Sequence, residues 1–205
     1  IGLNRFYEFP ESNFFKGKIK KTNNISDLSN ELDVVIVASN SLQRRSIIEE
    51  LIASKKVRYL ILEKVLFPNL VDYQEIEILL KKHQVKTWVN CPRRMMACYS
   101  KLKKIVSLDN TIHMSIVGGN WGLASNAIHF IDTFFYITDE ESIDINSFGI
   151  TKETKSKRVG YLEFEGTIFG KNNRNDSISI TSLKEQFPIQ IIISTANERI
   201  EINES

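Results

Sequence analysis

The sequence has few cysteines, few prolines and no long apolar run, and each scarcity excludes a class of protein. Its 2 cysteines, Cys91 and Cys98, are too few for the disulfide framework of a small secreted domain, so we expect free thiols and a cytoplasmic location. No segment reaches the roughly 20 continuous apolar residues of a membrane span, and no basic-then-apolar leader opens the chain, so no membrane partner is expected. With 4 prolines and 42% hydrophobic residues among 205, the composition is typical of a folded globular protein.

The net charge is also small, because the sequence has 27 basic and 25 acidic residues. The two basic clusters, Lys16 to Lys21 and Lys152 to Arg158, lack the interleaved aromatic residues of a nucleic-acid-binding surface. We therefore interpret them as solvated surface and expect no nucleic-acid partner. His83 and His113 have no cysteine or carboxylate neighbours at metal-ligand spacing, so no metal site is predicted.

Glycine is scarce in the first half of the chain, where only Gly2 and Gly17 precede Gly118. A dinucleotide-binding fold normally opens with a glycine-rich turn, because only glycine lets backbone amides approach the diphosphate at a helix N-terminus. Residues 1 to 32 show no convincing strand-turn-helix unit of this kind. Either the chain is the later part of a longer protein, or it does not bind a dinucleotide in that way.

Short apolar runs alternate with amphipathic stretches through the next part of the sequence. The predicted strands are Asp33 to Ala38, Val57 to Leu62 and Val85 to Cys91. Between them, apolar residues at three- and four-residue steps predict one helix after Ser41 and another after Pro68. This alternation predicts a parallel sheet with right-handed crossovers. A further helix is expected over Arg93 to Val106, and a further strand over Thr111 to Val117.

After Gly118-Gly119 the pattern changes to one helix, Leu123 to Ile137, and a series of β-branched or alternating runs. These runs are Ile143 to Ile150, Val159 to Phe169, Ile178 to Ser182, Ile189 to Ser194 and Arg199 to Ile202. The sequence thus predicts an α/β chain with an incomplete Rossmann-like parallel sheet in residues 1–108. An α+β domain with an open, mostly antiparallel sheet is expected in residues 109–205, and a homo-oligomer is expected to form through that sheet.

The charged pair Glu63-Lys64 stands at the end of a predicted buried strand. Ligands of open α/β sheets bind in the crevice outside the carboxyl ends of the strands, so two charges at this place indicate chemistry. A solvated pair at a strand exit fits the same residues equally well. The polar trio Ser39-Asn40-Ser41 follows the first strand and suits a helix cap.

A flavodoxin-like receiver domain is the other fold that this alternation of strands and helices allows. It is disfavoured because it does not explain the β-rich second half.

Four segments, in this order and at this spacing, resemble the Gfo/Idh/MocA oxidoreductases. They are Asp33 to Ser39 (DVVIVAS), Glu63-Lys64, Asn90 to Met95 (NCPRRM) and Asn126 to Asp132 (NAIHFID). The resemblance runs from about Ile25 to Phe169 and implies NAD or NADP as the cofactor and a sugar-like small molecule as the substrate. It implies that the cofactor is bound by Ser39, Asn40, Glu63, Lys64 and Asn90.

The same resemblance implies the catalytic residues. Lys64 matches the lysine beside the nicotinamide, where a positive charge polarises the reacting oxygen. His129 matches the histidine that exchanges a proton with the substrate hydroxyl, and its near-neutral pKa suits that work. We expect both residues to face one cleft between the two domains. Expected substrate contacts are Arg94, Trp121, Ser125 and Asn126, although Arg94 also suits a solvated surface and Trp121 a core.

Two positions depart from the family pattern. Val65 stands where the family has proline after Glu-Lys, and Ser125 stands where many members have aspartate four residues before the histidine. Asp132 lies one helical step from His129 and is predicted to orient its imidazole. Without a carboxylate at position 125, a non-catalytic nucleotide- or sugar-binding protein on the same scaffold is the alternative to an NAD(P)-dependent dehydrogenase.

Overall fold

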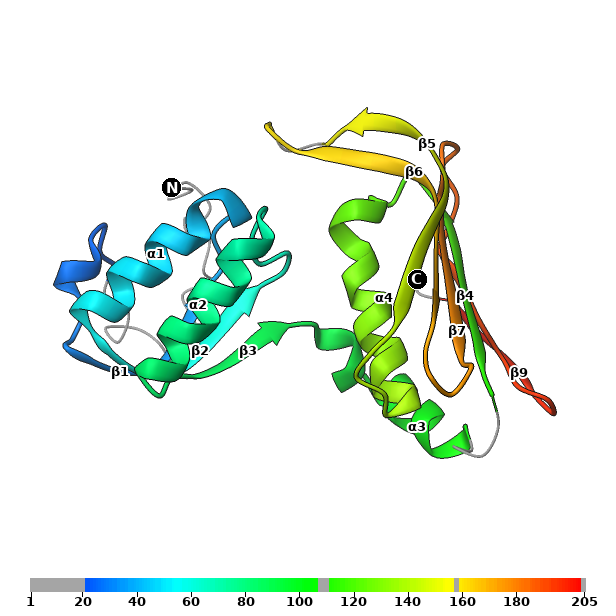
Figure 1. The fold of residues 1–205 in the computed structure, drawn as a ribbon, viewed down its shortest axis with the longest axis horizontal. Coiled ribbons are helices and arrows are strands. Elements are labelled where there is room, and N and C mark those ends of the chain that lie inside the picture. Colours follow the sequence, from blue (N-terminus) through cyan, green and yellow to red (C-terminus); the bar gives the residue numbers. More distant parts are fainter. Residues whose placement is uncertain (1–20, 107–110, 157–158, 204–205) are drawn as a thin grey trace, which may run out of the picture. The chain divides into compact units, whose positions relative to one another are not determined.

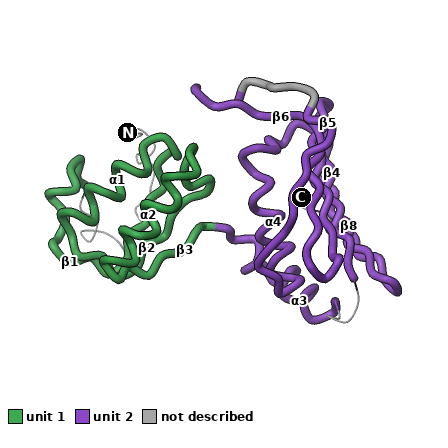
Figure 2. Tube along the Cα trace, viewed as in Figure 1, with its two compact units in different colours: residues 1–90 green, residues 91–205 purple. Residues whose placement is uncertain are grey.

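The computed structural model describes residues 21–106, 111–156 and 159–203. The chain divides into two compact units, residues 1–90 and 91–205 (Figure 2). This division falls earlier than the predicted boundary at 108/109. It does so because Tyr99 and Leu102 are buried in the core of the second unit, so the helix that carries them belongs there.

Unit 1 contains a three-stranded parallel sheet in the order β1-β2-β3 (Figure 1). The strands are β1 (Glu31–Val37), β2 (Lys56–Glu63) and β3 (Lys86–Asn90). Their register pairs Val37 with Leu62 and Glu63 with Asn90. All three strands therefore end at the same edge of the sheet, and the predicted adjacency and direction of these strands are confirmed.

Helices α1 (Ser41–Ser54) and α2 (Leu70–Lys82) cover one face of this sheet, and a 3-10 turn, η2 (Ile25–Asp27), precedes β1 (Figure 1). The buried core between helices and sheet includes Ile48, Leu51, Leu60, Leu62 and Ile76. The opposite face presents Val34, Ile36 and Trp88, which are all more than half exposed at 57%, 66% and 53%. The sheet is thus covered by described residues on one side only.

Unit 2 begins with the 3-10 turn η3 (Pro92–Met95) and helix α3 (Ala97–Ile105). The sequence predicted one helix over this stretch, but Met96 has an extended backbone (φ −72°, ψ 139°) and separates the two. Strand β4 (His113–Gly119) and helix α4 (Leu123–Thr138) follow. The remaining strands are β5 (Asp144–Lys155), β6 (Leu162–Lys171), β7 (Ser177–Leu183), β8 (Gln190–Ser194) and β9 (Arg199–Asn203).

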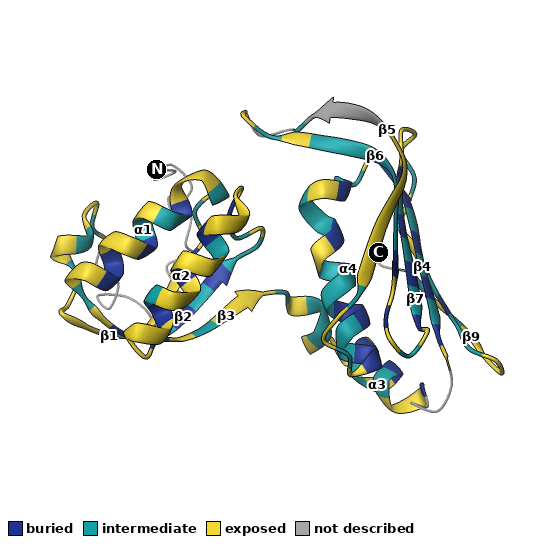
Figure 3. Ribbon diagram, in the orientation of Figure 1, coloured by how far each residue is buried: buried dark blue, intermediate teal, exposed yellow. Residues whose placement is uncertain are grey.

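The sheet of unit 2 has six strands in the order β5-β6-β7-β4-β8-β9. Its pairs are antiparallel except β4 with β7, which is parallel, so the sheet is mostly antiparallel, as the sequence predicted. Helix α4 packs on the face of the sheet that carries Met114, Ile116, Ile178 and Ile191 (Figure 3). Phe130 and Phe134 of α4 are fully buried in this core.

Candidate functional site

The carboxyl edge of the parallel sheet in unit 1 brings together three residues of the predicted cofactor site. One carboxylate oxygen of Glu63, Oε1, accepts a hydrogen bond from the Lys64 backbone N–H at 3.0 Å. The other, Oε2, accepts from Nδ2 of Asn90 at 3.0 Å. Glu63 therefore links the ends of β2 and β3, which the register places side by side. The Lys64–Val65 peptide bond that follows is cis.

Ser39 and Asn40 lie in the turn between β1 and α1, at the same edge of the sheet. Asn40 is the N-cap of α1, and its Oδ1 accepts from the Gln43 backbone N–H at 3.2 Å. This confirms the capping prediction, because such a side-chain acceptor satisfies an amide that has no helical partner. The hydroxyl oxygen of Ser39 is buried, and no described residue hydrogen-bonds to it.

Arg44 is a residue of this edge that the sequence interpretation missed. It lies in the first turns of α1, is 1% exposed, and donates to the carbonyl oxygens of Ser39, Val65 and Leu66. The signal was present in the sequence: Arg44 shares the face of the helix that carries Ile48, Leu51 and Ile52. A cation on an apolar face must find acceptors when it is buried.

In unit 2, the start of α4 gathers two predicted substrate residues, Ser125 and Asn126. The helix follows Gly122, whose φ of 81° lies in the left-handed region that glycine tolerates. Asn126 Nδ2 donates to the Trp121 carbonyl at 2.8 Å, which ties the helix to the turn before it. The Ser125 backbone N–H donates to Glu163 of β6 at 3.3 Å. Glu163 is a second missed residue, and its negative charge is favourable at a helix N-terminus.

His129 lies one turn along α4 from Ser125 and is partly buried. Asp132, which we expected to orient this histidine, has another partner in the structure. Both of its carboxylate oxygens accept from Arg94 of η3, with Arg94 Nε donating to Oδ2 at 2.8 Å. A planar guanidinium matches a carboxylate in this two-bonded geometry, which explains the pairing. The bond to Asp132 raises the pKa of Arg94, and burial opposes it in part.

Trp121 packs against other residues of unit 2. Its indole N–H donates to the Thr181 carbonyl at 3.0 Å, and its ring meets Phe130 edge-on with centroids 5.4 Å apart. These contacts favour the core role among the two that the sequence left open. His113 lies on β4, where its Nδ1 is 2.8 Å from the Ser177 hydroxyl, and burial lowers its pKa.

The residues present fit one part of a nicotinamide nucleotide. The edge of unit 1 offers a buried hydroxyl at Ser39, the amide of Asn90 and the charged pair Glu63-Lys64, all at the ends of adjacent parallel strands. Such groups suit the polar ring and ribose. No glycine-rich turn for the diphosphate occurs in the described part of unit 1, and within the described residues no three His, Cys, Asp or Glu side chains cluster as metal ligands.

Cys91 is partly buried and Cys98 is exposed, and no disulfide joins the two. No helix formed by the described residues is long and apolar enough to cross a membrane.

Three kinds of comparison with known proteins gave unequal results. No protein-family model matches the chain, and no curated protein matches its sequence. Solved structures do match. A dehydrogenase (MviM) from Clostridium difficile is similar with a TM-score of 0.65 and 16% identity, over 94% of this chain and 70% of that one.

Two further structures match over a smaller share of their own length. The super-repressor mutant of Gal80p from Saccharomyces cerevisiae has a TM-score of 0.67 and 18% identity, over 87% of this chain and 57% of that one. The apo scyllo-inositol dehydrogenase from Lactobacillus casei has a TM-score of 0.62 and 17% identity, over 87% of this chain and 59% of that one. The chain therefore has the Rossmann-like fold of these structures, and it spans about three fifths of the length of two of them.

Proposed function

We propose that this chain is the larger part of an NAD(P)-dependent oxidoreductase of the Gfo/Idh/MocA type. The observation that carries the proposal is the bonding of Glu63 to both the Lys64 amide and the Asn90 side chain, at the carboxyl edge of the parallel sheet. Solved structures of the same fold include a dehydrogenase and an inositol dehydrogenase, which supports a sugar-like or polyol substrate.

Each predicted residue then has a role. Ser39, Asn40, Glu63 and Asn90 bind the cofactor, which supplies hydride transfer when bound. Lys64 polarises the reacting oxygen, and His129 takes up or returns the hydroxyl proton. Ser125 and Asn126 bind substrate hydroxyls at the start of α4. Arg94 and Trp121 support this region without binding substrate through these groups, since the Arg94 guanidinium donates to Asp132 and the Trp121 indole N–H donates to the Thr181 carbonyl.

The proposal is tested on the complete protein with NAD⁺ and NADP⁺, which accept the hydride when a hydroxyl is oxidised, against a panel of inositols, free sugars and sugar nucleotides. Lys64→Ala and His129→Ala are each expected to lower turnover about a hundredfold, the usual scale for an acid-base group. Matched controls are Lys55→Ala, since Lys55 binds the carbonyls of Ser26 and Leu28, and His113→Ala on β4. Turnover that survives both active-site variants would reject the assigned roles.

A second candidate function is a non-catalytic nucleotide- or sugar-binding protein. The specific observation in its favour is Ser125, which leaves no carboxylate on α4 one turn before His129, and one structure of the same fold is a super-repressor mutant by name. Tight binding of nucleotide with no change in nicotinamide absorbance for any substrate, before and after Ser125→Asp, would favour this function over the enzyme.

The remaining proposals concern the setting of the protein. We infer assembly as a homo-oligomer through the six-stranded sheet and a cytoplasmic location. Sedimentation of the complete protein tests the first, and fractionation of the producing cell tests the second.

A further inference from the structure

Arg44 is a buried cation in unit 1 that the proposed chemistry does not use. Its side chain lies among the apolar residues of α1 and is 1% exposed. Arginine is almost never buried to this extent unless its charged group is paired or hydrogen-bonded. Its location therefore indicates a structural role for the guanidinium.

The guanidinium serves two loops at once. Nη2 donates to the carbonyl of Ser39, in the turn that follows β1. Nη1 donates to the carbonyls of Val65 and Leu66, the latter at 2.8 Å, in the loop that follows β2. A planar fork with five donors can hold carbonyls on two sides, whereas a lysine ammonium is a single point of charge.

These two loops carry most of the predicted cofactor residues. Ser39 and Asn40 follow β1, while Glu63 ends β2 and Lys64 follows it, and the register places Val37 beside Leu62 just before them. In a trans peptide the carbonyl and the next N–H point in opposite directions. Fixing the Ser39 carbonyl on Arg44 therefore also fixes the direction of the Asn40 N–H.

We propose that Arg44 is a positioning residue that holds the β1–α1 turn and the loop after β2 in one arrangement, and that the affinity of the protein for a nicotinamide nucleotide depends on this. The positional part follows from the hydrogen bonds of Arg44 alone. The affinity part rests on the proposed function. The two parts therefore need separate measurements.

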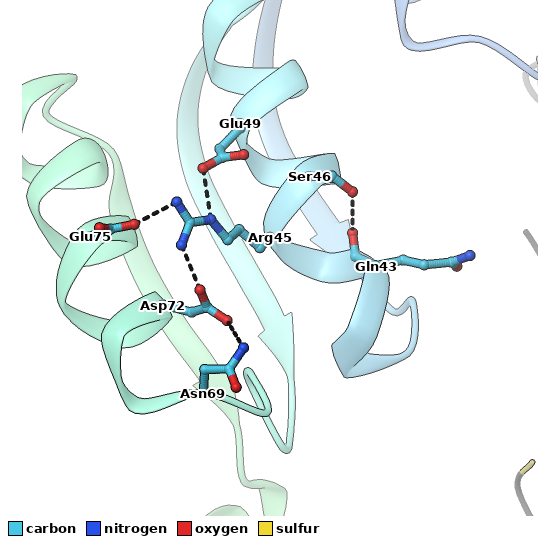
Figure 4. A network of polar contacts seen from close by, with 7 residues as sticks. All are labelled: Gln43, Arg45, Ser46, Glu49, Asn69, Asp72 and Glu75. Atoms are coloured by element: carbon cyan, nitrogen blue, oxygen red, sulfur yellow. Dashed lines mark hydrogen bonds and ion pairs between the residues drawn. The ribbon is translucent and has the colours of Figure 1, made fainter. Parts of the chain in front are cut away.

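The neighbouring Arg45 provides a matched control (Figure 4). It lies on the same helix, and its polar partners are Glu49 at 2.9 Å, Asp72 at 2.5 Å and Glu75 at 2.5 Å. These contacts connect α1 to α2 instead of to the two loops. Arg45→Met removes the same charged group one residue away and leaves the hydrogen bonds from Arg44 to the two loops in place.

The positional part is tested by amide hydrogen exchange on the complete protein, comparing wild type, Arg44→Met, Arg44→Lys and Arg45→Met. In Arg44→Met, exchange in residues 39–43 and 64–67 should accelerate about tenfold or more, because local opening of loops sets their exchange rates. Arg44→Lys should fall between it and wild type, and this variant carries the test if Arg44→Met does not fold. Arg45→Met should accelerate exchange in residues 69–75 instead. Unchanged exchange in the two loops, or acceleration spread evenly over unit 1, overturns the proposal.

The affinity part is tested by fluorescence titration of NADH and of NADPH into the same four proteins, at a temperature where all are folded. We expect the dissociation constant to rise about tenfold or more in Arg44→Met, less in Arg44→Lys, and to stay within about twofold in Arg45→Met. Loosened loops with unchanged affinity overturn the affinity part alone. If the wild-type protein binds neither nucleotide, the proposed function and the affinity part both fail, and hydrogen exchange still decides the positional part.

Discussion

The ion pair between Arg94 and Asp132 should be a real contributor to the stability of unit 2. Two unit charges about 3 Å apart interact by about 1.4 kcal/mol in bulk water and by about 5.5 kcal/mol at an effective dielectric constant of about 20. The side chain of Arg94 is 40% exposed and that of Asp132 is 19% exposed, so water screens the pair substantially. An exposed ion pair usually has a coupling energy of about 0.2–1 kcal/mol, and the two-bonded geometry of Arg94 and Asp132 adds to it. We expect a coupling energy of about 1.5 kcal/mol.

A double-mutant cycle measures this coupling energy. The free energy of unfolding is obtained from urea titrations of wild type, Arg94→Met, Asp132→Ala and the double variant. Methionine keeps the apolar stem of the arginine, so the cycle reports mainly on the guanidinium. The control is the exposed pair Arg199–Glu201 on β9, which is 2.8 Å apart and 65% and 59% exposed. Its coupling should not exceed about 0.5 kcal/mol.

Salt sharpens the comparison. In about 1 M NaCl, where the screening length falls to about 3 Å, the control pair should lose nearly all of its coupling and the Arg94–Asp132 pair less than half. A coupling energy below about 0.5 kcal/mol for Arg94 and Asp132 at low salt would refute the reasoning.

Three further predictions concern other elements. Gly119→Ala should lower the free energy of unfolding by several kcal/mol or prevent folding, because the new Cβ would lie 1.7 Å from the Glu185 carbonyl oxygen. Gly160→Ala is the control: nothing lies within 4 Å of its new Cβ, so it should cost only the strain of its positive φ, about 1 kcal/mol. Denaturant titration compares the two variants. Asn40→Ala should cost about 1 kcal/mol in the same assay and Asn40→Asp much less, since only alanine removes the cap acceptor. Burial lowers the pKa of His113, so its contribution to stability is full above the unfolded pKa of about 6.5 and is lost progressively as the pH falls from that value through the lower folded pKa. The unfolding free energy of His113→Gln should fall less than that of wild type between about pH 7.5 and 5.5, and an equal slope in both would contradict the assignment.

The fold of unit 1 was predictable because its signals are local. In the apolar run Val57 to Leu62, the residues Val57, Leu60 and Leu62 are buried, and the polar trio after β1 includes an N-cap at Asn40. Unit 2 was harder, since the parallel pairing of β4 with β7 joins residues such as His113 and Ser177, 64 positions apart. An alternating strand pattern shows which face is buried but not which strand lies beside it or in which direction.

The candidate site was predictable only where backbone register decides it. Glu63 and Asn90 meet because adjacent parallel strands end together, and both were chosen from the sequence. Asp132 was assigned to His129 from helical spacing, but the partner that the structure describes, Arg94, comes from a separate element. Glu163 reaches α4 from β6, and nothing in its own strand pattern distinguishes it from a solvated glutamate. Side-chain partners from distant elements depend on tertiary packing, which spacing does not encode.

The position of β4 in the sheet of unit 2 has a consequence for how that unit folds. The strands β5, β6 and β7 form antiparallel neighbours in sequence order, and β8 and β9 form a hairpin of their own. In the described sheet these two groups are joined through β4, which precedes both in the chain. Closing a long loop is slow because its entropy is lost before contacts form. Insertion of β4 between two preformed groups is therefore the expected late step, and the exposed edges of β7 and β8 before that step are where intermolecular strand pairing would begin.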